Sequence, residues 1–521
     1  AQAGDTCLVS AGTYNERVST FRSGTASSRI TIKAASATKP TVSGFSINHA
    51  YITVEGFLIS NTGAAVTVSG ANYCEILNNE FLGAEEGIDM SGSPASCRIR
   101  GNWFHGSTVV SVLITLRGSG HIVENNEFGP LVMHEDIFRP FGDNNTIRNN
   151  YFRNITSGNT GGHMDIFQIY GGASDRRVTN LLFEQNFVNG WPGQAWMVDC
   201  TSDSRLITVR NNVFYNVNSA GQSYCPENII FNNTFAYSGQ GNGRAVMIRN
   251  GGDEGAPSRG SGANSDIRNN IFYYTSYPND AYAGGYDVDN GAQATFESRN
   301  NIAYPTTSSG LLFGTGNLNG TNPQFGDASN AVGPDGRPFT ADDGLIPPNG
   351  APPCGAGESG TDIGAYKCGG AGLPPAGPPA GGGGNNQPPT VSITSPTSGQ
   401  NFPTAPATIT VTASVSDADG TIAKVEFYMD NTLRGTDGDN RAPWSYTFAS
   451  VPAGSHTYKV TAYDDKGATV SASVSVTVGT VSPPPSPSCP NPTGGTFSTA
   501  AAPCPTLSVS KTAITSTEPI T

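Results

Sequence analysis

The chain is poor in charged residues, and lysine is absent from a long stretch of it. Only 13% of its 521 residues are Asp, Glu, Lys or Arg, and no lysine lies between Lys39 and Lys367. The formal net charge is −13, whereas nucleic-acid binding needs a basic face. We therefore expect no nucleic-acid partner, and a catalytic lysine cannot be placed in the middle of the chain.

Long apolar runs and amphipathic helical patterns are also missing. No run of about 18 apolar residues occurs, so the sequence predicts no transmembrane span. No signal peptide is present. The strand patterns at the first and last residues look incomplete, and we interpret the chain as part of a longer protein. The 65 glycines and 36 prolines indicate a turn-rich β protein.

What is present is a repeated phrase, Asn-Asn-x-Phe or a close variant. Most repeats are 21 to 26 residues apart, and two intervals are 36 and 37 residues. The short intervals suit one coil of three brief strands, and the long ones suit the same coil with an inserted loop. Asn tolerates the left-handed conformation, and its amide can hydrogen-bond to the next Asn one coil up. The second residues of the repeats, hereafter the marker Asn, are Asn79, Asn102, Asn126, Asn150, Asn186, Asn212, Asn233 and Asn270.

These repeats and both ends of the repeated region carry a family resemblance. The opening stretch includes Ala3-Gly-Asp-Thr6 and Ile30-Thr-Ile-Lys-Ala34, and the closing one includes Thr361-Asp-Ile-Gly-Ala-Tyr366. With the repeats, they resemble the right-handed parallel β-helix proteins, an extracellular group that includes pectate lyases and chondroitinase-B-like and alginate lyases. The resemblance implies an all-β solenoid over residues 1–369. Activity has to be argued from a site, because one scaffold hosts many functions.

Composition divides the chain into several parts. Residues 389–479 contain short alternating runs at sandwich spacing and look like a bacterial immunoglobulin-like β-sandwich, with Trp444 and Tyr446 expected in its core. The predicted parts are a β-helix with a terminal cap at 1–369, a Gly/Pro linker at 370–388, the sandwich at 389–479, a Pro/Ser linker with a small disulfide loop at 480–505, and the start of a further β-domain at 506–521.

The nine cysteines predict disulfides. No Cys-x-x-Cys motif or Cys/His cluster occurs, which argues against a metal site built on cysteine. Cys74 and Cys97 each precede a marker Asn by five residues. They should face each other across adjacent coils, about 4.8 Å apart, although stacked free thiols are an alternative. The expected pairs are Cys74–Cys97, Cys200–Cys225, Cys354–Cys368 and Cys489–Cys504, with Cys7 left over; they favour an extracellular or cell-surface location.

A second sequence motif occurs twice, and it predicts the functional site. His134-Glu-Asp-Ile-Phe-Arg139 recurs as His163-Met-Asp-Ile-Phe-Gln168. Asp136 and Asp199 precede their marker Asn by 14 and 13 residues, which predicts that they stack. Asp165 lies 21 residues before its marker and joins them only if the turn at 171–176 is an insertion.

Stacked carboxylates repel one another and invite a cation, so Asp136, Asp165 and Asp199 are candidate calcium ligands. The resemblance implies that a calcium-dependent lyase would use such a cluster to neutralise a uronate carboxylate, while Arg139 removes the C5 proton. His134, His163 and Tyr170 are candidate acids or bases for a metal-free variant. Gln168, Trp191, Trp196 and Asp199 are candidate substrate-binding residues, since flat aromatic faces suit pyranose rings.

Two functions from different classes remain open. The first is a secreted or cell-surface protein that engages polysaccharide, with lyase action on a uronate-containing glycan as its finer form. The second is a non-catalytic structural or adhesive fibre subunit that self-assembles through its linkers and its C-terminal strand. For the site itself, the alternative is that His and Asp form only a structural ladder.

Overall fold

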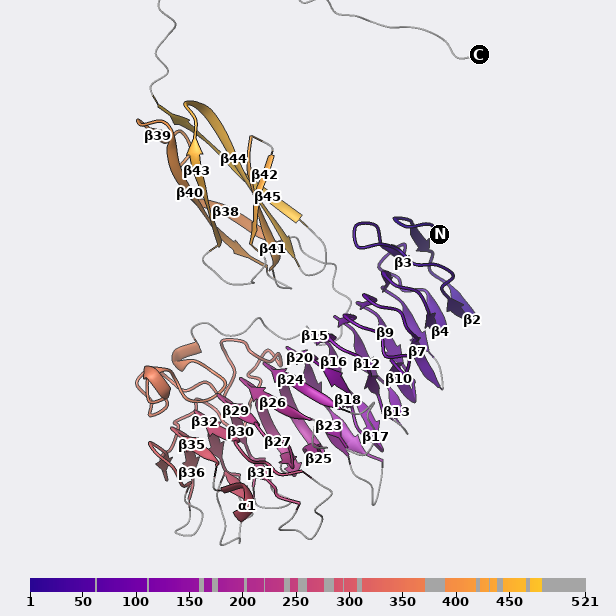
Figure 1. The fold of residues 1–521 in the computed structure, drawn as a ribbon, viewed down its shortest axis with the longest axis vertical. Coiled ribbons are helices and arrows are strands. Elements are labelled where there is room, and N and C mark those ends of the chain that lie inside the picture. The colour runs from indigo at the N-terminus through magenta and orange to yellow at the C-terminus, as the bar shows by residue number, and fades with distance from the viewer. Residues whose placement is uncertain are drawn as a thin grey trace, which may run out of the picture.

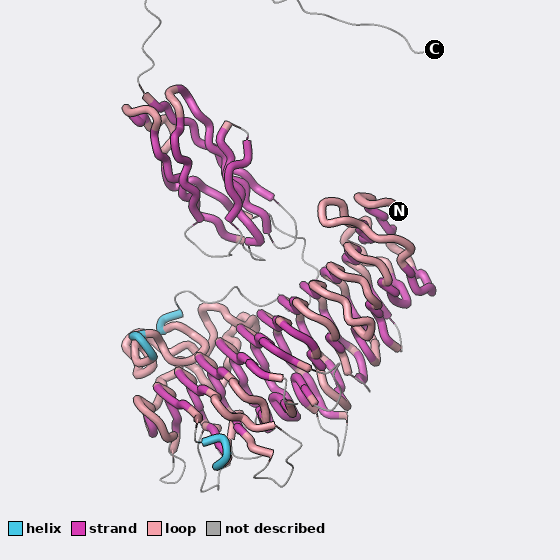
Figure 2. Tube along the Cα trace, in the orientation of Figure 1, coloured by secondary structure: helices cyan, strands magenta, loops and turns pink. Residues whose placement is uncertain are grey.

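The structure is a computed structural model that consists of a solenoid and a β-sandwich (Figures 1 and 2). It describes residues 1–60, 63–109, 112–158, 164–170, 177–200, 204–219, 221–238, 244–251, 260–275, 285–293, 295–306, 312–370, 389–417, 422–430, 432–437, 444–464 and 469–479. The predicted linker and disulfide loop at 480–505 and the predicted domain at 506–521 lie outside these residues, as does almost all of the predicted linker at 370–388.

The solenoid is a right-handed parallel β-helix, as the sequence predicted. One sheet runs along it with every neighbouring pair of strands parallel, so that each strand is contributed by one coil. This first sheet contains, in order, β1 (Thr6–Val9), β3 (Ile30–Ala34), β5 (Ile52–Glu55), β8 (Glu75–Leu77), β11 (Arg98–Arg100), β15 (Ile122–Glu124), β20 (Thr146–Arg148), β24 (Val178–Glu184), β26 (Arg205–Arg210), β29 (Ile229–Phe231), β32 (Asp266–Arg268) and β35 (Glu297–Arg299); β19 (Gly142–Asp143) also pairs with β24.

The remaining strands of each coil form a second, bent sheet with two arms. The first arm follows the marker Asn and contains β2 (Thr13–Ser19), β4 (Thr41–Ile47), β6 (Leu58–Ser60), β9 (Glu80–Leu82), β12 (Trp103–His105), β16 (Glu127–Phe128), β21 (Tyr151–Arg153), β25 (Phe187–Val198), β27 (Val213–Ser219), β30 (Thr234–Ala236), β33 (Ile271–Tyr273), β36 (Ile302–Tyr304) and β37 (Leu318–Asn319). The second arm contains β7 (Ala64–Val68), β10 (Glu86–Asp89), β14 (Ile114–Leu116), β18 (Phe138–Pro140), β23 (Asp165–Ile169), the end of β25, β28 (Gly221–Ser223), β31 (Val246–Ile248) and β34 (Tyr286–Val288).

Few other elements occur in the described part of the chain. Between the two arms, a small sheet is formed by β13 (Ser107–Val109), β17 (Leu131–Met133) and β22 (Ile155–Ser157). The helical elements are one α-helical turn, α1 (Asn290–Gln293), and two 3-10 turns, η2 (Glu358–Gly360) and η3 (Cys368–Gly370). No helix of the described residues is long and apolar enough to cross a membrane.

The repeated Asn pair has two separate structural roles. The first residue of the pair takes the left-handed conformation, as at Asn78 and Asn125, both with φ 54°. The second is a buried rung of a ladder: Nδ2 of Asn102 donates to Oδ1 of Asn126 at 3.0 Å and to the carbonyl of Ile76 at 2.8 Å. The same bonds recur from Asn79 to Asn301, which confirms the predicted alignment of the marker Asn.

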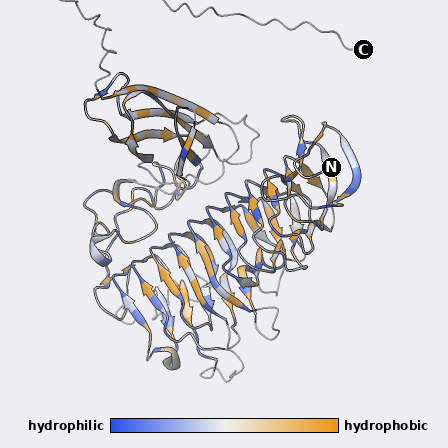
Figure 3. Ribbon diagram, turned by 45° about the horizontal axis from the view of Figure 1, so that its top comes forward, coloured by the Kyte–Doolittle hydropathy of each residue, from blue (hydrophilic) through white to orange (hydrophobic). Residues whose placement is uncertain are grey.

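The Phe of each repeat stacks in the core. The ring centroids of Phe104 and Phe128 lie 5.0 Å apart, and those of Phe128 and Phe152 lie 4.8 Å apart, with nearly parallel planes. A second stack joins Phe214, Phe235 and Phe272. Figure 3 shows the apolar residues of these strands in orange. Burying large side chains in each coil supplies the main driving force for the solenoid.

The terminal cap, which lies within residues 312–370, folds along one side of the solenoid. Phe339, Leu345 and Tyr366 of the cap pack on Tyr151 and Phe187, which face outward from the first arm of the bent sheet. On the cap's inner side the Tyr366 hydroxyl donates to buried Asp343 at 2.5 Å. The cap therefore covers an apolar outer face that the coils alone would expose to water.

Three of the four predicted disulfides are present in the described residues. They join Cys74 to Cys97, Cys200 to Cys225 and Cys354 to Cys368. Cys7, left over in the prediction, is exposed and unpaired among the described residues. The predicted pair Cys489–Cys504 lies outside them.

The C-terminal module is an immunoglobulin-like β-sandwich. One sheet contains β38 (Thr390–Ser395), β40 (Ala407–Ser416) and β43 (Trp444–Val451); the other contains β39 (Asn401–Phe402), β45 (Thr469–Val478), β44 (Gly454–Asp464), β41 (Ile422–Met429) and β42 (Thr432–Asp437). Trp444 is a member of the buried core and Tyr446 packs against that core, as the sequence predicted.

Candidate active site

Strand pairing brings the two copies of the doubled phrase together. Phe138 of β18 pairs with Phe167 of β23, so Asp136 and Asp165 occupy the same place in consecutive coils. The main-chain N–H of Asp165 donates to Oδ1 of Asp136 at 3.0 Å. The two carboxyl groups are therefore neighbours in the wall of the second arm.

Asp199 does not belong to this pair, contrary to the expected stacking of Asp136 with Asp199. Its N–H bonds to the carbonyl of Ile169 at 2.7 Å, which places it level with Tyr170. Phe138 pairs with Phe167, 29 residues on, whereas Thr146 pairs with Leu182, 36 residues on. The extra residues thus lie after β23, the insertion on which the pairing of Asp165 with Asp136 depended. In the next coil Asp165 pairs with Gln194, so Gln194 takes the place that the count had given to Asp199.

Asp136 is fully buried but has a charged partner. Its Oδ2 accepts from Nε of Arg139 at 2.9 Å, and Nη2 of Arg139 also bonds Glu135 at 2.8 Å. Burial raises the pKa of Asp136, the Arg139 guanidinium partly opposes that rise, and the result is about 6. The carboxyl group therefore titrates close to neutral pH instead of near pH 4.

Asp165 is also fully buried, and within the described residues neither of its carboxyl oxygens has a hydrogen-bond partner. Burial raises its pKa, and the neighbouring Asp136 carboxylate raises it further, to about 8. Because like charges this close resist joint ionisation, the pair holds about one proton near neutral pH.

Arg139 is held as a permanent cation. Burial lowers its pKa, but the Asp136 carboxylate outweighs this effect and the pKa is raised overall. The guanidinium carbon lies 5.3 Å from the centroid of the Tyr170 ring, a cation–π contact. The side chain is 22% exposed. A group with a raised pKa does not suit the role of base that the sequence suggested, whereas it suits the binding of an anion.

The residues do not fit the calcium site predicted for Asp136, Asp165 and Asp199. Calcium takes six to eight oxygen ligands, but no group of three or more His, Cys, Asp or Glu side chains in the described residues could hold a metal ion. One carboxylate of the buried pair is already bonded to Arg139.

The remaining predicted residues are spread around this pair. His134 is partly buried and lies against Gly158, while His163 lies outside the described residues. Gln168 follows Phe167 on β23 and pairs with Met197 on the outer side of β25. Tyr170 packs edge-on against Phe141, with the ring centroids 5.5 Å apart.

Trp191 and Trp196, predicted to line a sugar groove, are core residues. Each is 1% exposed. Trp196 stacks on Phe167 with centroids 5.8 Å apart, and Nε1 of Trp191 donates to the carbonyl of Gln194. Both lie in the long strand β25. Alternation alone would turn residues five positions apart to opposite sides, but a register shift between Trp191 and Gln194 accompanies the burial of both rings in the core. Neither ring presents a face to a sugar.

A row of outward-facing residues lies along the second arm and is hereafter called the outer row. Of its members, the sequence indicated only Arg139 and Gln168. The outer row runs through one residue per coil in register: Arg139, Gln168, Met197, Gln222, Met247 and Asp287. Gln222 accepts from Gln194 at 3.1 Å, and Arg249 bonds Asp289 at 2.9 Å beside the row. The marker Asn fixes the register of the strands on either side of it, in the first sheet and the first arm, so it gave no signal for these residues of the second arm.

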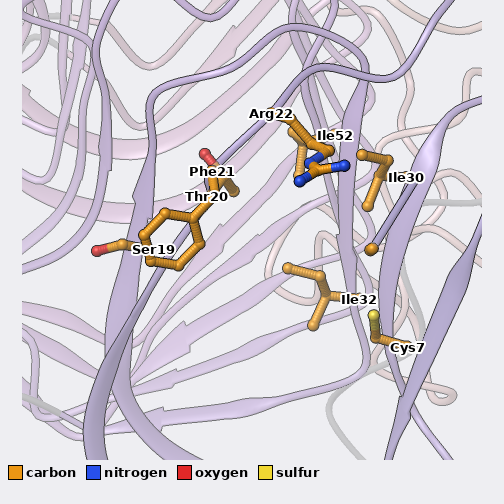
Figure 4. A pocket seen from close by; sticks show the side chains of 9 residues that line it. Cys7, Ser19, Thr20, Phe21, Arg22, Ile30, Ile32 and Ile52 are labelled. Atoms are coloured by element: carbon orange, nitrogen blue, oxygen red, sulfur yellow. The ribbon is translucent and has the colours of Figure 1, made fainter. Parts of the chain in front are cut away.

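An apolar cavity of about 360 Å³ lies elsewhere, at the N-terminal end of the solenoid (Figure 4). Ile30, Ile32 and Ile52 line it from the core side, with Cys7 and Phe21 at its border. It exposes the end of the solenoid core.

Comparison with known proteins agrees with the two-part architecture. Residues 389–460 match the family model described as bacterial Ig domain. The chain is a right-handed parallel β-helix followed by a bacterial Ig-like module. No curated protein matches the chain.

Several solved structures are similar to parts of the chain. Pectate lyase Pel9A matches at 14% identity, over 71% of this chain and 89% of that one, with a TM-score of 0.41. The catalytic domain of a GH87 α-1,3-glucanase matches at 11% identity, over 59% and 65%, with a TM-score of 0.29. Fibronectin(III)-like modules of Clostridium thermocellum CbhA match at 35% identity, over 17% and 97%, with a TM-score of 0.16.

Proposed function

We propose that this chain is an extracellular or cell-surface protein that engages polysaccharide at the outer row, and that it acts there as a lyase on a uronate-containing glycan. One observation carries the proposal. The Arg139 guanidinium is fixed by Glu135 and Asp136 over the Tyr170 ring. Its described hydrogen bonds use Nε and Nη2, which leaves Nη1 for a ligand.

The chemistry follows from this fixed cation. Nη1 of Arg139 donates to the uronate carboxylate and neutralises it, which makes the C5 proton more acidic. A base takes that proton, the electron pair forms the C4–C5 double bond, and the C4–O bond breaks as its oxygen accepts a proton. Tyr170, beside Arg139, is the proposed proton-transfer group.

Location outside the cytoplasm is supported by the disulfides. Cys74–Cys97, Cys200–Cys225 and Cys354–Cys368 link neighbouring coils and close the cap. Such bonds persist in oxidising compartments and are rare in the cytosol. A glycan outside the cell is therefore the class of polymer within reach of the outer row.

A second candidate function is a non-catalytic adhesive or structural role. The observation that favours it is the complete burial of Asp136 and Asp165. A dry carboxyl pair that bonds main-chain and Arg groups can serve the fold alone. In that case the outer row would bind glycan without cleaving it.

The decisive experiment uses the full chain with polygalacturonate, alginate and chondroitin sulfate, each with and without EDTA. A lyase produces an unsaturated product that absorbs at about 235 nm, because proton abstraction creates the C4–C5 alkene. Arg139→Ala should abolish the absorbance. Arg210→Ala, which removes an ion-paired arginine of the first sheet, should retain it. No absorbance from the unsubstituted chain with any of the three polymers would reject the lyase and leave the binding role.

A further inference from the structure

Two tyrosines form an exposed stack on the first coils, remote in sequence from the outer row. Tyr51 and Tyr73 precede β5 and β8, and their ring centroids lie 4.7 Å apart with planes 9° from parallel. Tyr73 is 44% exposed. Neither ring belongs to a hydrophobic cluster of the described residues. The stack is thus a surface feature and not an outlying part of the core.

The aromatic stack does not continue past Tyr73 into the next coil. The pairing of β8 with β11 places Ser96 level with Tyr73 in the next coil, and the pairing of β11 with β15 places Gly120 level with Ser96. Coils are about 4.8 Å apart, so the replacement of a ring by these small residues leaves a ledge beside Tyr73. One flat ring can continue the stack there over Ser96.

The ledge is rigid. Cys74 and Cys97, the residues after Tyr73 and Ser96, are joined by a disulfide. Oδ1 of Asn72 accepts from the N–H of Ala95 at 2.9 Å. These links join the coil of Tyr73 to the coil of Ser96. Binding of a ligand would therefore need little free energy to order the site.

Polar groups border the ring. Arg29 donates to the Tyr73 carbonyl at 2.5 Å and pairs with Glu75 at 3.1 Å. Arg98, whose side chain is 39% exposed, stands beside Glu75 in the neighbouring coil. An aromatic face with hydrogen-bonding groups at its edge matches a sugar ring, which presents C–H groups on its face and hydroxyls around its rim.

The backbone at this corner does not favour tyrosine. Tyr51 and Tyr73 both have φ 58°, in the left-handed region, where bulky residues are uncommon. Asn144 and Asn180 take the same corner position in later coils with φ 58° and 57°. Asn suits this conformation better, so each ring is held at a local backbone cost.

From the stack, the ledge and their rigid polar border, we propose that Tyr51 and Tyr73 form a second glycan-binding site, which takes one sugar ring of a polysaccharide on the free side of Tyr73. It is a binding site without catalytic groups. The inference goes beyond the lyase function and does not depend on it.

The test is native affinity electrophoresis of the full chain in gels that contain glucomannan, xyloglucan or polygalacturonate. Tyr73→Asn removes the ring but keeps a residue suited to the left-handed backbone, so the variant should fold. It should weaken retardation by at least one of the polymers about tenfold. Leu206→Asn makes the same kind of change at the equivalent corner of a later coil and should leave retardation unchanged.

A second variant tests the ledge itself. Ser96→Tyr should extend the stack, fill the ledge and weaken retardation as much as Tyr73→Asn does, while Tyr73→Phe should bind normally. Equal retardation of Tyr73→Asn and the unsubstituted chain, or no retardation by any of the three polymers, would overturn the proposal and make a protein ring the alternative occupant.

Discussion

The N–H of Asp165 donates a 3.0 Å hydrogen bond to Oδ1 of Asp136, so two buried carboxyl groups stand at the same place in consecutive coils. Their pKa values are raised to about 8 and about 6. Of these two carboxyl groups, only that of Asp136 is bonded to Arg139. The pair therefore has an asymmetric form near neutral pH, with Asp136 ionised toward Arg139 and Asp165 carrying the proton.

This asymmetry predicts how stability depends on pH. In the unfolded chain both carboxyls ionise near pH 4, so between about pH 4 and pH 8 the folded state binds more protons than the unfolded state. Stability from this pair is complete at low pH and falls as pH rises through the folded values. Asp165→Asn, which mimics the protonated form, should raise the melting temperature at about pH 9 by an amount worth a few kcal/mol, and change it little at about pH 4.

Circular dichroism melts at the two pH values check this prediction. Glu297→Gln is the control, because that side chain is 70% exposed on the first sheet and its loss should not produce a pH-dependent gain. A melting temperature of Asp165→Asn that tracks the unsubstituted chain at both pH values would show that the pair does not retain its proton.

The Asn ladder gives a second prediction. Nδ2 of Asn126 donates to Asn150 and to the carbonyl of Ile99, and its Oδ1 accepts from Asn102. Asn126→Ala leaves several buried groups unbonded and should cost about 2–4 kcal/mol of unfolding free energy. Urea denaturation followed by intrinsic fluorescence measures it.

The neighbouring position supplies the matched control for the ladder. Asn125 has φ 54°, and its side-chain oxygen has no partner among the described residues. Asn125→Gly keeps the left-handed backbone accessible, so it should shift the unfolding free energy by about 1 kcal/mol or less. Similar losses from both substitutions would mean that the two roles in the repeat are not separate.

The same ladder explains how much of this molecule the sequence predicts. The marker Asn is a local turn signal repeated once per coil, so it predicted the solenoid, the Asn alignment and the Cys74–Cys97 pair. Its register applies to the first sheet, which precedes the marker turn, and to the first arm, which follows it. The second arm lies beyond loops of varying length, and there the count failed for Asp199.

The aromatic residues show a second limit. Trp191 and Trp196 lie in a Gly- and Pro-containing stretch that is typical of a loop, but tertiary pairing makes it part of the 12-residue strand β25. Burial then follows from which side of a strand a residue faces, and neither composition nor turn residues indicate that. The outer row is set by the same pairing, so its members beyond Arg139 and Gln168 could not be predicted for the same reason.

The cap provides a third prediction. The Tyr366 hydroxyl and the N–H of Phe339 both donate to Oδ2 of Asp343. Burial raises the pKa of Asp343 to about 7, so Tyr366→Phe should destabilise the cap by about 1–3 kcal/mol, more above pH 7 than below it because the ionised carboxylate then loses a donor. Limited proteolysis should cut the variant within 312–370 faster. Tyr73→Phe, on an exposed ring, should be cut at the unsubstituted rate.

The last prediction concerns the competition for Arg139. Glu135, whose side chain is 44% exposed, bonds Nη2 of Arg139 at 2.8 Å and would repel an approaching uronate carboxylate. Glu135→Gln removes that charge and leaves the buried Asp136 contact in place, so the KM for the cleaved polyuronate should fall about threefold. The fall should be smaller at high salt, because exposed charges are screened.

Arg139→Lys cannot bond Asp136 and a ligand carboxylate in the same fork geometry, so its kcat/KM should fall about 100-fold. Initial rates at about 235 nm over a range of substrate and salt measure both changes. A higher KM for Glu135→Gln would mean that Glu135 holds Arg139 in place for the substrate and does not compete with it.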